Sequence, residues 1–356
     1  MAFTNVMIGR WPKARGQAGC GINALKPAQG HWHMTWGAWR RACLLVVLGR
    51  LFAASAALLW ALPACGAADA APIPKVASGR IERIDGLASR HVDARPVDVW
   101  IPGGCDTDQR CPVIYMQDGQ MLFDDALTWN RQSWHLDRAM SALIAARRIP
   151  PTIVVAIWND GKYRWSEYFP QKILEAMAEP ARSEFTAGLL QGRQLSDAYL
   201  QFLVGELKPH IDERYPTLAD RAHTFVAGSS MGAVISVYAL NEFPDVFGGA
   251  AGLSVHWAGK LEANVEIPLA TFTYLLGHLA EPGGHRLYLD HGTTGLDAWY
   301  APYQLFIDQI VLARGYMPQN FASRVFDGAG HSEDDWGRRV AIPLEFLLGP
   351  LSAPDR

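Results

Sequence analysis

The sequence predicts an α/β protein built on one mostly parallel sheet of about eight strands, with helices on both faces. Three observations predict it. From residue 79 onward, apolar runs of strand length alternate with amphipathic runs of helix length. The later strand-like runs are short and continuously apolar, which is typical of strands buried on both faces of a parallel sheet. No internal repeat or low-complexity linker interrupts the alternation, so right-handed crossovers should connect the strands.

The expected elements follow in order along the chain. The first two strands lack an intervening helix, so the sheet should begin with an antiparallel pair. Strands are expected near 80–86, 95–101, 112–117, 152–158, 223–227, 246–253, 285–290 and 321–326. Helices are expected near 133–146, 196–211, 232–242, 299–314 and 335–347.

Composition is that of a globular protein with a small-molecule partner. The 356 residues are 49% hydrophobic and 19% charged, enough to bury a large core. A formal charge of -3 gives no general electrostatic reason to bind nucleic acid or an anionic membrane. We expect one folded domain over 72–356, preceded by an N-terminal extension over 1–71. The sequence leaves the oligomeric state open.

The N-terminal extension contains the layout of a secretory signal peptide. Two arginines precede an apolar run over 42–62, and small residues follow over 63–71. Because residues 1–33 show neither apolar periodicity nor a charge block, translation is expected to start at Met34. The protein should then be exported, to the periplasm or outside the cell, with no stable membrane span after processing.

Two alternatives to cleaved export remain open. About 20 apolar residues suffice to span a bilayer, so the run could be a permanent anchor, although the small residues after it argue against one. The residues before Cys65 also resemble a bacterial lipoprotein box, which would make Cys65 a site of lipidation.

Cysteine usage fits export. After removal of the leader, Cys105 and Cys111 remain, between strand-like runs at 97–101 and 113–116. A connection that closes two neighbouring strands brings its ends near enough for a disulfide, which persists in an oxidising compartment. The alternative is two free thiols in a polar loop.

Ser230 is the candidate nucleophile. It is the middle residue of the only Gly-x-Ser-x-Gly in the chain, at 228–232. The motif alone is weak, but this one follows a strand at 223–227 and opens a helix. A strand-turn-helix elbow needs glycine on both sides of a serine in a strained conformation, and the helix N-terminus favours negative charge there. The alternative is a glycine-rich packing turn.

A serine hydroxyl needs a neighbouring base, and in the α/β-hydrolase fold the order along the chain is serine, acid, histidine. The last predicted strand runs into a glycine-rich loop that ends in His331, the candidate base. Asp290 and Asp297 both follow the preceding strand. We favour Asp297, which lies in the loop. The alternatives are that Asp297 only caps the next helix and that Asp290 is the acid.

Acyl transfer also needs two backbone N–H groups aimed at the developing oxyanion. One should come from Met231, directly after the nucleophile. The other should come from the loop after the third strand, at 115–123.

Four segments of the chain resemble an esterase family of α/β-hydrolases. This family includes Esterase D, feruloyl and acetylxylan esterases, enterochelin-esterase-like proteins and the mycolyltransferases. An Asp-Gly after the third strand separates it from lipases that have a His-Gly loop. The segments lie between residues about 90 and 347, nearly the whole expected mature chain. They are 115–123, 164–170, 228–232 with 243–247, and 292–297 with 330–331.

The resemblance implies roles for two residues. The second oxyanion N–H would be that of Gln120, and the acid would lie in the loop after Gly-Thr, which again favours Asp297. This chain departs from the family here, because related esterases often place the acid two residues after Gly-Thr, whereas Thr294, Gly295 and Leu296 intervene.

The expected activity is hydrolysis of a carboxylic ester through an acyl-enzyme on Ser230. The alternatives are an acyltransferase of the mycolyltransferase type and a non-catalytic envelope binding protein on the same fold. No cofactor is expected, and no ligand cluster has zinc spacing. Four residues are candidates for the substrate pocket, a hint at sugar, phenolic or siderophore esters against plain rim packing: Trp158, Arg164, Trp165 and Trp257.

Overall fold

The computed structural model describes residues 71–350. The chain divides into two units, Met1–Ala67 and Ala68–Arg356, and all of the described residues belong to the second. The predicted signal peptide, the start at Met34 and the lipidation at Cys65 lie outside the described residues, so they stay predictions. None of the helices within 71–350 is long and apolar enough to cross a membrane.

All eight predicted strands are present, and they form one sheet in the order β1-β2-β4-β3-β5-β6-β7-β8. The pair β1–β2 is antiparallel, as predicted, and so is β2–β4, whereas every pair from β4 to β8 is parallel. The carboxyl ends of the parallel strands therefore meet at one edge of the sheet. The strands are β1(Arg80–Ile84), β2(Val97–Ile101), β3(Val113–Met116), β4(Ile153–Ile157), β5(Thr224–Ser229), β6(Gly249–Leu253), β7(Arg286–Gly292) and β8(Phe321–Phe326).

Each predicted helix is also found, two of them in a divided form. The run at 196–211 is two α-helices joined by a π-helical turn at Leu203–Leu207, and the run at 335–347 is α11 followed by α12. These helices are α2(Leu136–Ala145), α6(Ser196–Phe202), α7(Lys208–Arg214), α8(Met231–Glu242), α10(Ala301–Ala313), α11(Glu333–Arg339) and α12(Ala341–Leu348).

Within residues 71–350, four α-helices were not predicted. Three of them have between five and seven residues, too short for a helical period to show in the sequence. The fourth, α9, carries apolar side chains on its buried and exposed sides alike, for example the exposed Leu269 and Leu276. The four are α3(Arg164–Tyr168), α4(Gln171–Ala176), α5(Ala181–Ala187) and α9(Glu266–His278).

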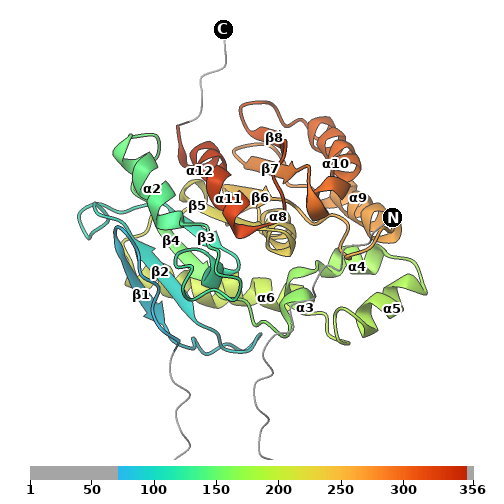
Figure 1. The fold of residues 1–356 in the computed structure, drawn as a ribbon, viewed down its shortest axis with the longest axis horizontal. Coiled ribbons are helices and arrows are strands. Elements are labelled where there is room, and N and C mark those ends of the chain that lie inside the picture. Colours follow the sequence, from blue (N-terminus) through green and yellow to red (C-terminus); the bar gives the residue numbers. More distant parts are fainter. Residues whose placement is uncertain (1–70, 351–356) are drawn as a thin grey trace, which may run out of the picture. The chain divides into compact units, whose positions relative to one another are not determined.

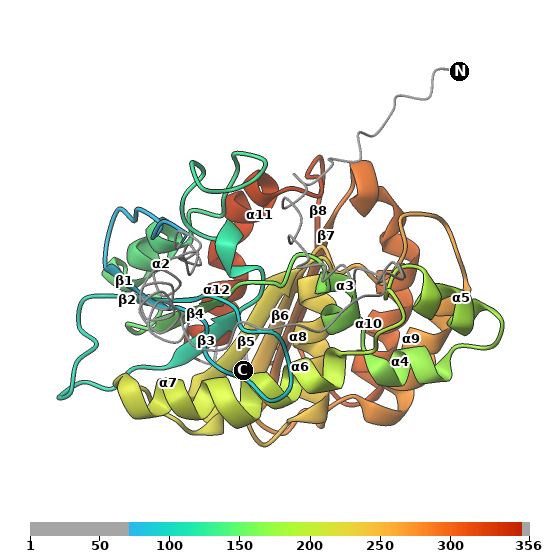
Figure 2. The same ribbon diagram turned by 90° about the horizontal axis from the view of Figure 1, so that it is seen from below.

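The helices lie on both faces of the sheet, and each face has its own apolar core (Figure 1). Figure 2 shows α6 and α7 on the opposite side of the sheet from α11. In β3, Val113 and Tyr115 face the cluster formed with α3 to α10, whereas Ile114 and Met116 face the cluster formed with α2, α11 and α12. This alternation is the two-residue period of a strand, and it explains why the central strands read as continuously apolar.

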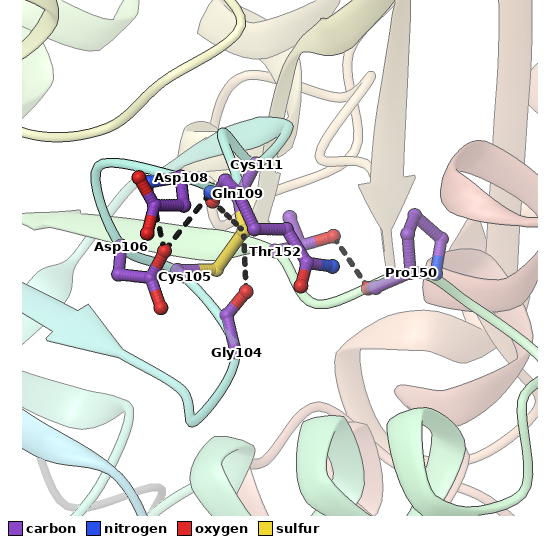
Figure 3. Close-up of a disulfide and its surroundings, with 8 residues drawn as sticks. All are labelled: Gly104, Cys105, Asp106, Asp108, Gln109, Cys111, Pro150 and Thr152. Carbon is purple, nitrogen blue, oxygen red and sulfur yellow. Dashed lines mark hydrogen bonds between the residues drawn. A yellow bond between two sulfur atoms is a disulfide. The ribbon is translucent and has the colours of Figure 1, made fainter.

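The predicted disulfide joins Cys105 to Cys111, with the two Cα atoms 5.7 Å apart (Figure 3). Pairing of the flanking strands does not account for it, contrary to the expectation from sequence, because β4 lies between β2 and β3 in the sheet. The loop closes locally instead. The Asp106 carboxylate accepts hydrogen bonds from the backbone N–H groups of Asp108 and Gln109, each at 2.9 Å.

Candidate active site

Ser230 lies in a tight elbow between β5 and α8. Its φ of 56° and ψ of -125° are strained for a residue with a side chain. A Cβ added to Gly228 would lie 2.6 Å from the carbonyl carbon of Gly232, so both positions leave room for backbone alone. The strand-turn-helix that the motif predicts is therefore present. Ser230 is half-buried, at the edge where the parallel strands end.

His331 and Asp297 meet at the same edge, from the loops after β8 and β7. The His331 Nδ1 and the Asp297 Oδ1 are 2.6 Å apart. Asp297 is fully buried, and the His331 side chain is 18% exposed. Because Nδ1–H donates to the carboxylate, the other ring nitrogen, Nε2, is left free to accept a proton.

Asp297 is held by more than the histidine. Its Oδ2 accepts a hydrogen bond from the backbone N–H of Gly292 at 2.7 Å and another from the Ser254 hydroxyl. Burial by itself would raise the pKa of Asp297, but the hydrogen bonds from His331, Ser254 and Gly292 outweigh it and lower the pKa below its ordinary value. Asp297 is therefore held as a carboxylate.

The loops that carry the acid and the histidine are joined by their backbones. The Ala329 carbonyl accepts from the N–H groups of Thr293 and Thr294 at 2.9 and 3.0 Å. This approach is so close that a Cβ on Gly292 would lie 2.2 Å from the Ala329 oxygen. The Gly-Thr step of the sequence thus has a physical reason: only glycine lets the two loops touch.

Asp290, the alternative acid, has other partners. It is fully buried, and its carboxylate accepts from Arg339 at 2.9 Å, from the Ser254 N–H at 3.0 Å and from the Tyr288 hydroxyl at 3.2 Å. Burial raises the pKa of Asp290, and the Arg339 guanidinium opposes that rise. The carboxylate that bonds to His331 is that of Asp297, which favours Asp297 as the acid.

The predicted oxyanion loop is the short 3-10 turn η1(Gly119–Met121), which follows β3. Asp118, just before it, has a φ of 55°. A Cβ added to Gly119 would lie 2.4 Å from the backbone of Ala156, so the turn packs directly on β4. Gln120 lies in this turn and Met231 is the first residue of α8, positions at which a backbone N–H has no partner within its own helix.

Arg164 lies close to this turn but is already paired. Its guanidinium donates to both oxygens of Asp118, at 2.7 and 2.8 Å. The Asn159 side-chain amide donates to the same carboxylate at 2.6 Å. A Cβ added to Gly232 would lie 2.9 Å from Asp118 Oδ2, so this carboxylate also borders the elbow. The geometry favours Arg164 as a support of the turn over a direct contact with substrate.

The three tryptophans predicted for the pocket lie in different surroundings. Trp257 is 2% exposed and donates its indole N–H to Gln304 at 2.9 Å, which makes it part of the core. The Trp158 N–H donates to Asp98 at 2.9 Å. Trp165 packs edge-on against His256, with ring centroids 5.8 Å apart. Of the three, Trp165 is the one linked by ring contacts toward the candidate triad.

Residues that the sequence did not single out complete the site. The His256 ring is 6.4 Å from that of His331, and its Nδ1 is 2.6 Å from the Tyr300 hydroxyl. Burial and then the nearby His331 lower the pKa of His256 to about 3, so this second histidine is neutral at neutral pH. Trp336 packs edge-on against His331 at 5.0 Å. Of the residues that surround Asp297 and His331, only Ser254 could have been singled out from the sequence, because it directly follows a buried parallel strand.

The comparison with protein families identifies the chain. The model of the family described as "Putative esterase" matches residues 93–293, more than half of the 356 residues. The chain belongs to this esterase family. Its class of reaction is therefore hydrolysis of an ester bond, and its class of substrate is a small-molecule ester.

Two curated relatives of this esterase have no assigned activity in their names. "Uncharacterized protein YbbA" of Bacillus subtilis (strain 168) is 21% identical over 272 residues, which cover 74% of this chain and 96% of the relative. "Uncharacterized protein YjcH" of the same organism is 25% identical over 151 residues, 42% of this chain and 51% of the relative.

Solved structures share the fold. The enterobactin esterase FES from Shigella flexneri superposes with a TM-score of 0.56 at 19% identity, over 77% of this chain and 60% of that enzyme. A ferulic acid esterase gives a TM-score of 0.56 at 18% identity, over 76% of this chain and 97% of that one. The chain thus spans about 60% of the length of the enterobactin esterase. These likenesses establish the predicted α/β-hydrolase fold.

Proposed function

We propose that this esterase hydrolyses a carboxylic ester through an acyl-enzyme on Ser230. The observation that carries the proposal is the hydrogen bond between His331 and the fully buried Asp297. The elbow that presents Ser230 supports the proposal as well, because β5, β6, β7 and β8 are parallel neighbours and their carboxyl ends share one edge of the sheet.

The residues then divide the chemistry between them. His331 Nε2 takes the proton of the Ser230 hydroxyl as its oxygen attacks the ester carbonyl. The N–H groups of Gln120 and Met231 donate to the oxyanion of the tetrahedral intermediate. When the intermediate collapses, the alcohol leaves with the proton from His331. Asp297 stays ionised throughout and holds the imidazole in the tautomer that keeps Nε2 free.

Water completes the cycle. It attacks the acyl-enzyme and gives its proton to His331, and the second intermediate releases the carboxylic acid as the proton returns to Ser230. Oriented donors at the site of the developing charge are usually the largest single contribution to such a reaction. We therefore expect the oxyanion turn to matter as much as the triad.

The proposed substrate is a phenolic, siderophore or sugar ester. The names of the structural neighbours, an enterobactin esterase and a ferulic acid esterase, support an ester with an aromatic acyl group. Trp165 at the site also supports it, because an aromatic side chain offers a face for such a group. The Cys105–Cys111 disulfide supports export, since such bonds persist in oxidising compartments.

Replacement of the nucleophile tests the proposal. Ser230→Ala is expected to lower kcat by at least about 10³-fold, because the serine, histidine and acid act as a unit. Turnover should be measured on p-nitrophenyl acetate, feruloyl and acetyl sugars and catecholate esters. A fluorophosphonate probe should label the wild type at Ser230 and leave Ser230→Ala unlabelled.

The control is Ser183→Ala, which removes an exposed hydroxyl from α5 and should keep full turnover and labelling. Wild-type turnover in Ser230→Ala, or stoichiometric labelling at another residue, would show that the nucleophile is assigned wrongly. Product analysis with an added sugar alcohol separates hydrolysis from acyl transfer, because hydrolysis gives free acid and transfer gives a new ester.

A further inference from the structure

Ser254 lies directly after β6, at the edge where the candidate triad assembles, and its side chain is fully buried. Its hydroxyl has three partners. The Trp336 indole N–H donates to it at 2.8 Å, and the Arg339 guanidinium donates to it at 2.8 Å. The third partner is Oδ2 of Asp297. None of these contacts is needed to form the strand, so the hydroxyl requires its own explanation.

The chemistry of the partners fixes the direction of the hydroxyl proton. An indole N–H and a guanidinium can only donate. Together they occupy both lone pairs of the Ser254 oxygen, and its single hydrogen is left to point at Asp297. An ionised Asp297 can only accept. The four groups therefore have one consistent arrangement, in which Ser254 donates to the acid.

The arrangement extends to the second carboxylate. Arg339 donates to both oxygens of Asp290, at 2.9 and 3.3 Å, and the Ser254 N–H donates to Asp290 as well. Arg339 is 4% exposed and Asp290 fully buried, so this pair is shielded from water. Another guanidinium–carboxylate distance, from Arg339 to Asp297 Oδ2, is 4.0 Å. Ser254 thus bridges the ion pair of Asp290 and the acid of the candidate triad.

We propose that Ser254 is a positioning residue for catalysis, which holds Asp297 ionised and turned so that its Oδ1 meets the Nδ1–H of His331. This inference rests on the proposed acyl-enzyme function. The Ser254 and Gly292 bonds occupy Oδ2 and leave Oδ1 for the histidine. Loss of the Ser254 donor frees the carboxylate to rotate or to turn toward Arg339. Either movement weakens its bond to His331 and the stabilisation of the imidazolium.

A purely structural role predicts something different. In that case Ser254 only satisfies the buried N–H groups of Trp336 and Arg339, and its loss lowers stability without changing the chemistry of the molecules that remain folded. The kinetics of the folded enzyme separate the two roles, because only positioning changes the protonation of His331.

The test is Ser254→Ala, assayed on p-nitrophenyl acetate with the full chain. We expect kcat to fall about 10- to 100-fold, the effect of losing one hydrogen bond to a charged group. KM should change less than about threefold, because no substrate contact is lost. The acid limb of the kcat/KM profile should move to lower pH, as the imidazolium loses support. The rate of fluorophosphonate labelling should fall with kcat, while labelling still reaches one equivalent.

Two further variants support the test, one as a control and one as a second way to remove the Ser254 hydroxyl. Thr271→Val removes another buried hydroxyl, on α9, which donates to the Ile267 carbonyl, and should keep wild-type kcat and pH profile. Ser254→Gly removes the same hydroxyl at a position whose φ is 46°, so it suits the backbone if the alanine variant folds poorly. It should reproduce the loss of kcat and the shift of the acid limb.

The proposal is overturned if folded Ser254→Ala or Ser254→Gly keeps kcat within about twofold, or if the acid limb stays in place. Failure of the underlying function looks different. In that case Ser230→Ala would stay active or the wild type would stay unlabelled, whatever the Ser254 variants do.

Discussion

Two pairs of an aspartate and an arginine lie near the sheet edge at which the parallel strands end, and they differ in exposure. In the pair beneath the acid, the Asp290 side chain is 0% and the Arg339 side chain 4% exposed. In the pair beside the oxyanion turn, the Asp118 side chain is 12% and the Arg164 side chain 23% exposed. Both make two guanidinium–carboxylate hydrogen bonds. Water therefore reaches one pair and is excluded from the other.

The difference teaches what each pair can do. A buried ion pair that loses one partner leaves an uncompensated charge in the core, so it acts on stability. A pair that water partly reaches recovers some of a lost partner's interaction from water, so less stability depends on it than on the fully buried pair. What it does fix is geometry: Asp118 begins the turn that carries Gln120. We therefore expect the first pair to be structural and the second to act mainly on the rate.

The largest expected effect is that of Asp290→Asn on stability. It should lower the free energy of unfolding by about 3–5 kcal/mol, because Arg339 keeps its charge in a site closed to water. Urea unfolding followed by tryptophan fluorescence measures this. The control is Glu179→Gln, which breaks an exposed pair with Arg182 and should cost less than about 1 kcal/mol.

The same variant decides between the two candidate acids. If Asp297 is the acid, the folded fraction of Asp290→Asn keeps kcat within about 100-fold, whereas Asp297→Asn loses about 10⁴-fold. The reverse ranking would mean that Asp290 is the acid. Comparison per folded molecule, from active-site labelling, removes the effect of unfolding on the measured rate.

The second effect is that of Arg164→Met on the rate. Complete loss of an oxyanion donor costs about 10²–10³-fold in kcat, so loosening the turn should cost roughly 10- to 100-fold. KM should stay near its wild-type value, and stability should fall less than in Asp290→Asn, because the Asn159 amide still donates to the Asp118 carboxylate. Arg182→Met, on the surface, is the matched control. A rise in KM with unchanged kcat would instead support the contact with substrate that the sequence suggested for Arg164.

The sequence predicted what depends on short stretches of chain. Strands β3, β4 and β6 are buried on both faces and are therefore apolar throughout, which is why they could be predicted from short runs of sequence. The elbow at Ser230 and the glycine-rich loop at His331 are likewise local patterns. The disulfide was predicted, although the strands around it are not neighbours.

What the sequence could not predict depends on partners distant along the chain. The sequence favoured Asp297 over Asp290 by its place in the loop and by the family resemblance, but it could not give their partners. Arg339, which pairs with Asp290, lies 49 residues away. Arg164 was a candidate for the substrate pocket, and its partner Asp118 lies 46 residues before it. The roles proposed for these residues therefore depend on the fold, which brings residues from distant parts of the chain to one edge of the sheet.

The smallest expected effect at neutral pH concerns His256, whose pKa depends on charged groups from both regions. Burial, then His331 and Arg164, lower the pKa of His256 to about 3, and Asp297 opposes them. Its ordinary pKa is about 6.5, so between pH 6.5 and pH 3 the unfolded chain binds a proton that the folded protein refuses. Stability should therefore fall with falling pH across this window, by about 1 kcal/mol per pH unit from this group.

His256→Phe removes the titrating group while keeping a ring beside Trp165 and Tyr300. Urea unfolding at pH 7, 6, 5 and 4 should then give a shallower loss of stability for the variant than for the wild type, whatever the offset between them at pH 7. Equal slopes would mean that His256 takes up its proton in the folded state near its ordinary pKa. In mild acid, the site would then carry a second charged histidine beside His331. The difference in exposure between the Asp290–Arg339 pair and the Asp118–Arg164 pair would then not extend to His256.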